Sequence, residues 1–394
     1  MIPRPLIGYC TNVHAGVDLK SIKENLEHYA VAVRDAGDAD ELGVGLWIPA
    51  AAARELAADA GDFSDFLHQR KLNAFTINGF PFDNFHQEVV KHTVYQPTWA
   101  ETSRLDYTCQ LADILANLLK AQPEDQIGSI STLPLGWPTE LGSAAALDRC
   151  GENFRKLAVY LRQIESACGR RIMVAIEPEP GCQLDTTDDV IDWFETQLPD
   201  PIHRRHLSVC HDVCHSAVMM ESQSEVLSRL AGAGIAVGKV QVSSAVKVRW
   251  DQMSVARQQE AISQLAEFGE DKYLHQTGRR FGNNEFALTE DLPTLVRDVV
   301  NRVINLESES QWVVHFHVPI FLERFGHLET SQEDVLECLR FLSTSKSCPE
   351  FTGHLEIETY AWTVLPEAMR KRGLAADIAK EISWLNTVIS KLEE

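Results

Sequence analysis

Residues 170–181 read RRIMVAIEPEPG, and this stretch predicts how the rest of the chain is organised. The apolar run from Ile172 to Ile176 is short and is followed by Pro and Gly, which is typical of a buried strand in a parallel sheet. Proline cannot donate to a sheet ladder, so we expect the strand to end before Pro178 and to deliver Glu177. A carboxylate there is costly unless it is paired or binds a cation, and the alternative is a Glu that is solvated in a loop.

The rest of the chain repeats this pattern of short apolar runs separated by longer amphipathic stretches. Such alternation is typical of βαβ units and a parallel sheet. Ten runs are strand candidates: 6–13, 44–48, 74–77, 127–133, 172–176, 207–210, 235–242, 273–277, 312–318 and 354–360. We therefore predict one domain over residues 1–394, a (β/α)8 TIM barrel. The last run is assigned as strand eight, so residues 270–350 are expected to form an insertion between strands seven and eight.

Composition and charge limit the classes of function. The chain has 394 residues, 44% of them hydrophobic and 24% charged, which is ordinary for a globular protein with a large core. The formal net charge of -21 repels phosphate backbones and disfavours nucleic acid as a partner. No apolar run is long enough to span a membrane, and the N-terminal MIPRPLIGYC lacks the features of a signal peptide.

The cysteines indicate the compartment. There are 9 of them, scattered along the chain and without a CxxC pair, which argues against a secreted disulfide framework. We expect reduced thiols and a cytoplasmic protein.

Polar side chains follow four of the predicted strands. Acidic, amide and imidazole groups at the carboxyl ends of parallel strands would meet at one face of a barrel, where active sites of this fold lie. A mixed oxygen and nitrogen set suits a divalent ion such as Mn²⁺, Mg²⁺, Co²⁺ or Zn²⁺. The residues are Glu177 in IEPEP, Asp212 and His215 in HDVCH, Gln241 in KVQVSS, and Glu356 with Glu358 in HLEIETYAW.

This set resembles the xylose-isomerase-like TIM-barrel superfamily, which includes sugar-phosphate isomerases, epimerases and endonuclease-IV-type nucleases. The resemblance implies a Glu after strand five, an Asp-x-x-His after strand six, a His on strand seven and a Glu on strand eight. The matching residues are Glu177, Asp212, His215 and Glu356, while Gln241 stands in place of the His. It implies metal ligation by these five residues, with Glu177 and Glu356 doubling as catalytic acid and base groups.

Longer stretches resemble a narrower group, the EboE-type metabolite traffic proteins. These stretches are YCTNVHAG, LWIPA, FTINGFPF, HTVYQPTWAETSRLDY, STLPLGW, KVQVSSA, YLHQ, HFHVPIF and LEIETYAW, and they cover nearly the whole chain. The resemblance implies a role in a bacterial gene cluster linked to prenylation or export of metabolites, and it supplies no reaction.

Further residues are candidates for binding a substrate. His315 and His317 alternate in VVHFHVP, and His275 lies in an apolar run, although a histidine in a strand is often a satisfied core residue. The segment from Asp83 to Ser103 is long and aromatic, which is typical of a functional loop. The full set of substrate-binding candidates is His14, Trp137, Glu179, His275, His315, His317 and Glu358.

Three functions are compatible with these observations. The first is a metal-dependent sugar or sugar-phosphate isomerase or epimerase acting on a small polar metabolite. The second is a protein that binds or carries a metabolite without turning it over, and the third is a phosphoesterase of the endonuclease IV kind. In each case the expected partner is a small molecule, and the chain is a possible homo-oligomer.

Overall fold

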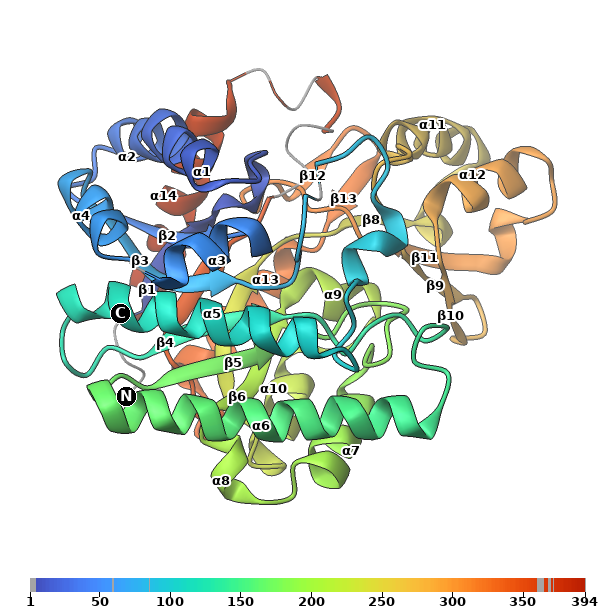
Figure 1. The fold of residues 1–394 in the computed structure, drawn as a ribbon. Coiled ribbons are helices and arrows are strands. Elements are labelled where there is room, and N and C mark those ends of the chain that lie inside the picture. Colours follow the sequence, from blue (N-terminus) through green and yellow to red (C-terminus); the bar gives the residue numbers. More distant parts are fainter. Residues whose placement is uncertain are drawn as a thin grey trace.

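The structure is a computed structural model that describes residues 5–58, 60–84, 86–359, 365–367, 370 and 372–393. Eight parallel strands close into a barrel in the order β1-β14-β7-β6-β5-β4-β3-β2 (Figure 1). They are β1 (Leu6–Cys10), β2 (Leu42–Trp47), β3 (Leu72–Asn78), β4 (Gly128–Thr132), β5 (Ile172–Ile176), β6 (Leu207–Asp212), β7 (Val237–Val242) and β14 (His354–Ile357). The predicted barrel is confirmed, and the last predicted strand does close it between β7 and β1. Tyr360, the last residue of that prediction, lies outside the described residues.

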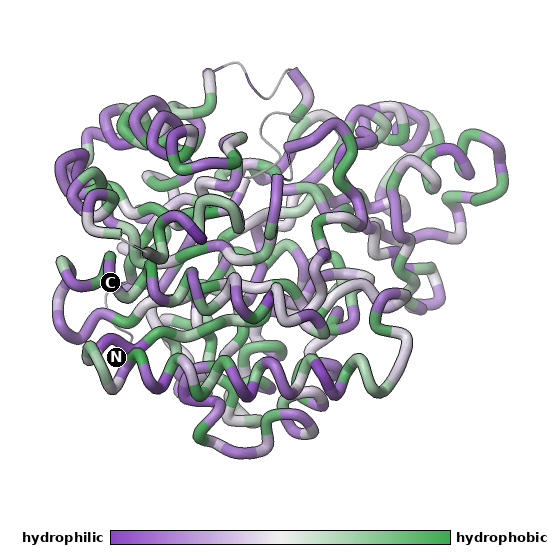
Figure 2. Tube along the Cα trace, viewed as in Figure 1, coloured by the Kyte–Doolittle hydropathy of each residue, from purple (hydrophilic) through white to green (hydrophobic). Residues whose placement is uncertain are grey.

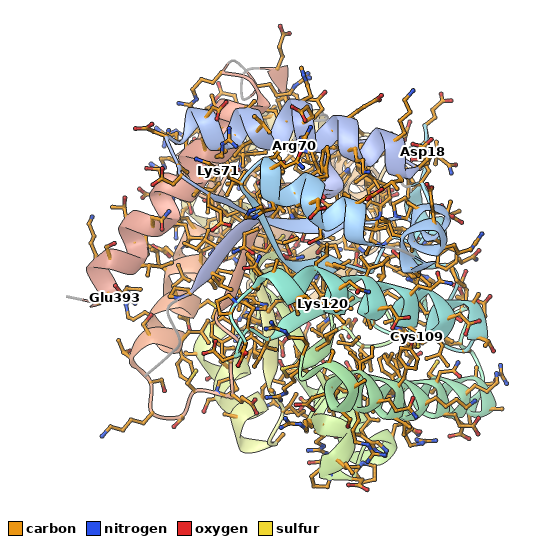
Figure 3. All side chains as sticks on the ribbon, turned by 60° about the vertical axis from the view of Figure 1, so that its left-hand side comes forward. Asp18, Arg70, Lys71, Cys109, Lys120 and Glu393 are labelled. Carbon is orange, nitrogen blue, oxygen red and sulfur yellow. The ribbon has the colours of Figure 1, made fainter. Side chains whose placement is uncertain are left out.

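Helices cover the outside of the barrel (Figure 1). Each follows a strand along the chain, so its apolar face packs on the sheet and its polar face meets solvent. Asp18 caps the first of them by accepting a hydrogen bond from the Ser21 N–H at 2.8 Å (Figure 3). The helices around the barrel are α1 (Leu19–Asn25), α2 (Val31–Ala36), α3 (Ala50–Ala58), α4 (Gly61–Gln69), α5 (Thr102–Leu118), α6 (Ala144–Cys168), α7 (Thr187–Gln197), α8 (Pro201–Arg204), α9 (Val213–Val218), α10 (Gln223–Gly232), α13 (Gln332–Thr344) and α14 (Leu374–Glu393).

A second sheet forms from the chain between β7 and β14. Its strand order is β10-β9-β11-β8-β13-β12, and it extends to the right of the barrel in Figure 1 together with two helices. This part has its own apolar core, in which Trp250 and Trp312 are fully buried. Its elements are β8 (Val246–Arg249), α11 (Val255–Leu265), β9 (Thr277–Phe281), β10 (Phe286–Thr289), α12 (Leu292–Val300), β11 (Glu309–Val314), β12 (Arg324–Phe325) and β13 (Leu328–Thr330).

The second sheet differs from the sequence prediction in two ways. It begins at Val246, before the expected boundary at residue 270. The predicted strand 273–277 is displaced toward the C-terminal side, because β9 starts only at Thr277, and the predicted strand 312–318 is displaced toward the N-terminal side, because β11 runs from Glu309 to Val314. Residues 273–276 and 315–318 are therefore irregular backbone, which frees them to turn over the barrel.

Hydropathy follows the layers of the fold. Figure 2 shows mostly hydrophobic residues in the barrel strands and a mixture of hydrophobic and hydrophilic residues along the outer helices. All five residues of β5 and all six of β6 are buried, as expected for parallel strands covered on both faces. Within the described residues, no helix combines the length and apolar character that crossing a membrane requires.

The barrel interior contains a buried ion pair between neighbouring strands. Lys239 on β7 donates to Glu356 on β14, and Asn78 on β3 donates to the other Glu356 oxygen at 2.7 Å. A Cβ on Gly45 would lie 1.5 Å from a Glu356 oxygen, so only glycine leaves room for this carboxylate. The pair fills the centre of the barrel below the ends of the strands.

Removing one partner of this pair should strongly destabilise the fold. We expect Lys239→Met to lower the free energy of unfolding by about 3–5 kcal/mol, because Glu356 is then buried without a countercharge. The double variant Lys239→Met/Glu356→Leu should recover most of the loss in urea denaturation. A single variant as stable as the wild type would contradict this role.

Helix α14 is joined to the top of the barrel by Glu381. One oxygen of this carboxyl accepts hydrogen bonds from Ile320 N–H at 3.0 Å and from the Thr359 hydroxyl at 2.9 Å. The other oxygen accepts none from the described residues. Burial raises the pKa of Glu381 to about 8. The folded protein therefore keeps a proton that the unfolded chain releases above its ordinary pKa of 4.5.

The stability of the protein should accordingly fall as the pH rises through this window. Glu381→Gln removes this titration. The free energy of unfolding of the variant minus that of wild type should therefore increase by about 1–3 kcal/mol from about pH 5 to about pH 9. Urea denaturation at both pH values measures this difference, with the exposed Glu24→Gln as the control. An equal difference at both pH values would contradict the assignment.

Candidate metal centre and substrate pocket

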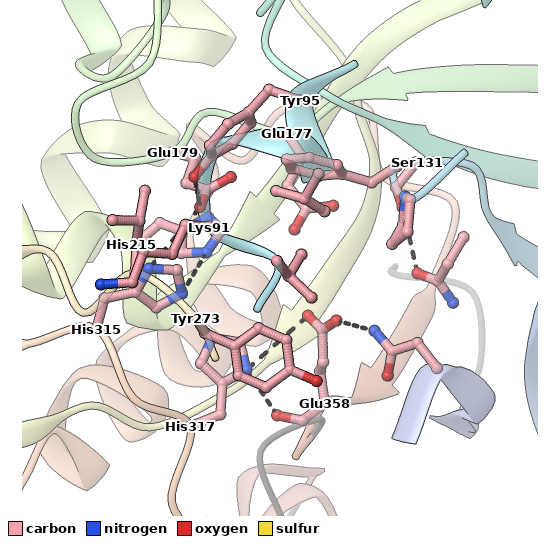
Figure 4. A pocket seen from close by; sticks show the side chains of 17 residues that line it. Lys91, Tyr95, Ser131, Glu177, Glu179, His215, Tyr273, His315, His317 and Glu358 are labelled. Atoms are coloured by element: carbon pink, nitrogen blue, oxygen red, sulfur yellow. Dashed lines mark hydrogen bonds and ion pairs between the residues drawn. The ribbon is translucent and has the colours of Figure 1, made fainter. Parts of the chain in front are cut away.

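A pocket opens at the carboxyl ends of the barrel strands (Figure 4). It contains about 660 Å³ of space, part of it open to solvent. Asn12, Asn78, Ser131, Glu177 and Glu358 follow or end strands and form its floor. Its roof comes from the segment after β3 and from the irregular segments before β9 and after β11.

Glu177 lies where the sequence predicts, directly after β5. Its N–H donates to the Thr132 carbonyl at 2.9 Å, which extends the strand by one residue before Pro178. The Glu177 side chain is 4% exposed. Burial raises the pKa of this carboxyl to about 7, although the neighbouring His215 acts to lower it. Glu179 from the same turn accepts a hydrogen bond from the Tyr95 hydroxyl at 2.8 Å.

Asp212 ends β6 and begins α9. One carboxylate oxygen, Oδ1, accepts from the His215 N–H at 2.9 Å and from the Ser243 hydroxyl at 2.7 Å. The other, Oδ2, is buried and accepts no hydrogen bond from the described residues. It lies 4.0 Å from Nε2 of His215 and 3.9 Å from Nε2 of His317. Although burial alone would raise the pKa of Asp212, these two histidines lower it.

The hydrogen bonds at Nδ1 fix the tautomers of three histidines. Nδ1 of His215 lies 2.8 Å from the Pro178 carbonyl, and Nδ1 of His317 lies 2.9 Å from the Glu358 carbonyl. Nδ1 of His315 lies 2.8 Å from Oε1 of Gln276, whose amide nitrogen is directed at the Pro180 carbonyl. All three partners are acceptors, so each Nδ1 carries a proton and, in a neutral ring, each Nε2 carries a lone pair.

Two of these lone pairs face one another. Nε2 of His215 and Nε2 of His315 are 3.2 Å apart, so neutral rings need a proton or a cation between them or beside both. An Nδ1–H bound to a carbonyl with Nε2 directed at a site is the arrangement of metal-ligating histidines in general. Burial, together with His215 and His317, holds the pKa of His315 well below its usual range, whereas Asp212, Glu179 and Glu177 raise the pKa of His215 despite its burial, so a proton between the two rings belongs to His215.

The carboxylates lie beside these rings. Oxygens of Glu177, Asp212 and Glu358 are all within 4.8 Å of one another and buried. Glu358 accepts from the Asn12 amide at 2.6 Å, and burial raises its pKa well above the usual range, with Glu177 and Asp212 adding to the rise. Like charges this close are costly in a buried site without a cation.

The donor set fits a divalent ion. Carboxylate oxygens and neutral imidazole nitrogens are ligands for Zn²⁺, Mn²⁺ and Co²⁺, and Asp212 Oδ2 is a buried acceptor that lacks a hydrogen-bond donor among the described residues. Glu177, Asp212, His215, His317 and Glu358 are the side chains that could hold it. Glu179 and His315 adjoin them through His215.

Two predicted ligands lie outside this group. Glu356 lies on β14, one layer deeper than Glu358, which follows the end of that strand, and the Glu356 carboxylate is paired with Lys239. The Gln241 amide donates to Asn78 at 3.0 Å, also below the pocket. The imidazole of His317, in the segment after β11, lies 3.9 Å from the Asp212 carboxylate.

Three other predicted residues do not line the pocket. His14 is bonded to the Tyr9 hydroxyl at 3.1 Å and stacks on Tyr29, and burial lowers its pKa to about 3. Trp137 packs against Tyr95 from behind. His275 bonds Glu270 and the His315 carbonyl, so it supports the roof.

Several lining residues were not predicted as site residues from the sequence. They are Asn78, Ser131, Tyr273 and Leu274, together with Asn12, which was noted only as a neighbour of His14. Asn78 and Ser131 end or nearly end barrel strands, and that position was the available signal. Tyr273 and Leu274 carried no such signal, because they reach the pocket from the second half of the chain.

Comparisons with known proteins bear on the fold. No family model matches the chain, and no curated protein matches its sequence. A xylose isomerase-like TIM-barrel protein from Mycobacterium smegmatis, in complex with magnesium, aligns with a TM-score of 0.52 at 11% identity over 98% of this chain and 97% of that chain. An L-ribulose 3-epimerase aligns with a TM-score of 0.48 at 11% identity, over 98% of this chain and 95% of the other. The IolI protein with a bound zinc atom aligns with a TM-score of 0.45 at 11% identity, over 98% of both chains. The fold is that of a xylose-isomerase-like TIM barrel.

The carboxylates should affect stability in opposite directions with and without metal. In metal-free protein, Glu358→Gln should raise the free energy of unfolding by about 1–3 kcal/mol, because it removes a buried like charge. With saturating Zn²⁺ the same variant should be less stabilised than wild type, because a ligand is lost.

Thermal denaturation with chelator and with Zn²⁺ measures both effects, and the exposed His327→Ala is the control. A variant that shifts stability equally in both conditions would contradict a cation site.

Proposed function

We propose that this protein is a metal-dependent enzyme of the isomerase or epimerase type that acts on a small hydroxy-carbonyl compound. The observation that carries the proposal is the buried group of Glu177, Asp212 and Glu358. The Nε2 atoms of His215 and His317 face the same space as these carboxylates. The position of the pocket at the strand ends supports it, since barrels place their chemistry there. The likeness of the fold to a magnesium-bound relative agrees with it.

The residues have distinct roles in this proposal. Asp212, His215 and His317 would hold a divalent ion together with Glu177 and Glu358, and the ion would polarise the carbonyl of the substrate. Glu177 and Glu358 flank the same space, so one carboxylate takes a proton from the carbon beside the carbonyl and the other returns a proton. Asn12, whose amide oxygen accepts no hydrogen bond from the described residues, orients a substrate hydroxyl from the floor. Glu358 takes the role that spacing alone gave to Glu356.

The biological context follows from the resemblance to EboE-type metabolite traffic proteins. That resemblance supports a place in the biosynthesis or traffic of a metabolite. It also supports the alternative of a protein that binds the metabolite without turning it over, which the experiment below distinguishes.

A metal phosphoesterase is the third candidate. The extra imidazoles of His315 and His317 favour it, because they allow more than one ion per chain. The concentration of carboxylates at the site and the net charge of -21 oppose a phosphodiester substrate. Cleavage of an aryl phosphate by the Zn²⁺-loaded protein would support it.

Proton exchange tests the proposed chemistry directly. In D₂O, the Zn²⁺- or Mg²⁺-loaded protein should replace the carbon-bound protons of dihydroxyacetone with deuterium, and proton NMR follows the loss. Glu177→Gln should slow this exchange by about 10²–10⁴-fold, because it removes a general base. Glu140→Gln, outside the pocket, should not. Binding of dihydroxyacetone without exchange would favour the carrier, and exchange unaffected by Glu177→Gln would contradict the mechanism.

A further inference from the structure

The roof of the pocket differs in chemistry from its floor. The floor is made of carboxylate, amide, hydroxyl and imidazole groups, whereas most of the roof is apolar. The side chains that make the apolar part are Phe80, Pro81, Val90, Val94, Tyr273 and Leu274. In the view of Figure 4, Tyr95 lies at the top beside Glu179, and Tyr273 lies lower, next to His317 and Glu358.

This roof is fixed by hydrogen bonds between its two segments. The N–H groups of Val90 and Lys91 both donate to the Lys272 carbonyl, at 2.8 Å and 3.1 Å. Val90 and Tyr273 pack with Trp47, whose indole N–H donates to the Pro81 carbonyl at 3.0 Å. Val90 is 4% exposed and Leu274 is 6% exposed. The apolar surface is therefore a built wall of the pocket, enclosed by other parts of the chain.

Among the described lining residues of the pocket, no Lys or Arg side chain is available to bind an anionic substrate. Lys91 is the one cationic side chain among its described lining residues apart from the histidines, and its ammonium group is 2.7 Å from an Asp291 oxygen. The floor presents Glu177, Glu179 and Glu358 instead. A phosphate group on the substrate would meet these carboxylates without an arginine or free lysine to bind it.

We propose that the substrate is an uncharged hydroxy-carbonyl compound that carries an apolar substituent, and not a sugar phosphate. The polar head lies on the floor and the apolar substituent lies against Val94, Tyr273 and Leu274. This assignment deepens the proposed function and rests on it. The sequence alone predicts a sugar or sugar phosphate as the substrate. The apolar wall disfavours both, because it offers no hydrogen-bond partners to the hydroxyl groups of a sugar.

Three probes with the same head group separate the possibilities. Dihydroxyacetone, dihydroxyacetone phosphate and 2-hydroxyacetophenone share a hydroxymethyl ketone. The second group on the carbonyl carbon is hydroxymethyl in the first, its phosphate ester in the second and phenyl in the third. We expect 2-hydroxyacetophenone to bind the Zn²⁺-loaded protein about tenfold more tightly than dihydroxyacetone, because the ring is buried against apolar surface. Dihydroxyacetone phosphate should bind more weakly than dihydroxyacetone. Calorimetric titration measures all three.

Variants of the wall assign the effect to these residues. Val94→Ser and Leu274→Ser should each reduce, several-fold, the ratio of the affinity for the phenyl probe to the affinity for dihydroxyacetone. Leu274→Lys should improve binding of the phosphate probe. Val303→Ser, at a position that is 74% exposed, is the control. Because Val94 is only half-buried, its variant keeps the test valid if Leu274 variants fold poorly.

The outcomes separate this inference from the proposed function. Tighter binding of dihydroxyacetone phosphate, or equal binding of the phenyl and hydroxyl probes, would overturn the inference while metal binding and proton exchange stand. Failure of the protein to bind Zn²⁺ or any of the three ketones would overturn the proposed function and this inference with it. A preference for the phenyl probe that the two Ser variants do not change would also overturn the assignment to this wall.

Discussion

The concentration of negative charge at the mouth of the barrel is the constraint on which the site depends. Glu177, Asp212 and Glu358 come from three different strands, yet their oxygens lie within 4.8 Å in a buried space. Protonation relieves part of this repulsion, which is why burial and mutual repulsion raise the pKa of Glu177 and Glu358. A divalent ion relieves it more completely. The same arrangement that is unfavourable for the empty fold is therefore favourable for binding a cation.

The part of the chain that forms the second sheet supplies the site with imidazole groups and roof residues that the barrel strands do not provide. On β7 the position of a ligating imidazole is taken by Gln241, which bonds Asn78 below the pocket. His315 and His317 reach the site from the irregular segment after β11, and their rings are oriented by Gln276 and by the Glu358 carbonyl. The same part of the chain supplies Tyr273 and Leu274 to the roof. Ligation and substrate enclosure thus both depend on the chain between β7 and β14.

The sequence predicts the barrel well because its strands are short apolar runs that end at Pro, Gly or polar residues. Of the second sheet it predicts only the runs 273–277 and 312–318, and it misses strands such as β12 and β13, because these have two and three residues and are partly exposed. The predicted group of Glu177, Asp212 and His215 does meet in space. Spacing places both Glu356 and Glu358 on the inner face of one strand. Only Lys239, from the neighbouring strand, decides that Glu356 is neutralised, and spacing along the chain cannot reveal that pairing.

The most direct test of the metal centre is X-ray absorption spectroscopy of the protein loaded with one equivalent of Zn²⁺. The account predicts at least two imidazole nitrogens and carboxylate oxygens at about 2.0–2.2 Å, with one imidazole lost in His317→Ala. A spectrum of zinc coordinated by water and carboxylates alone, or one that His317→Ala leaves unchanged, would contradict it.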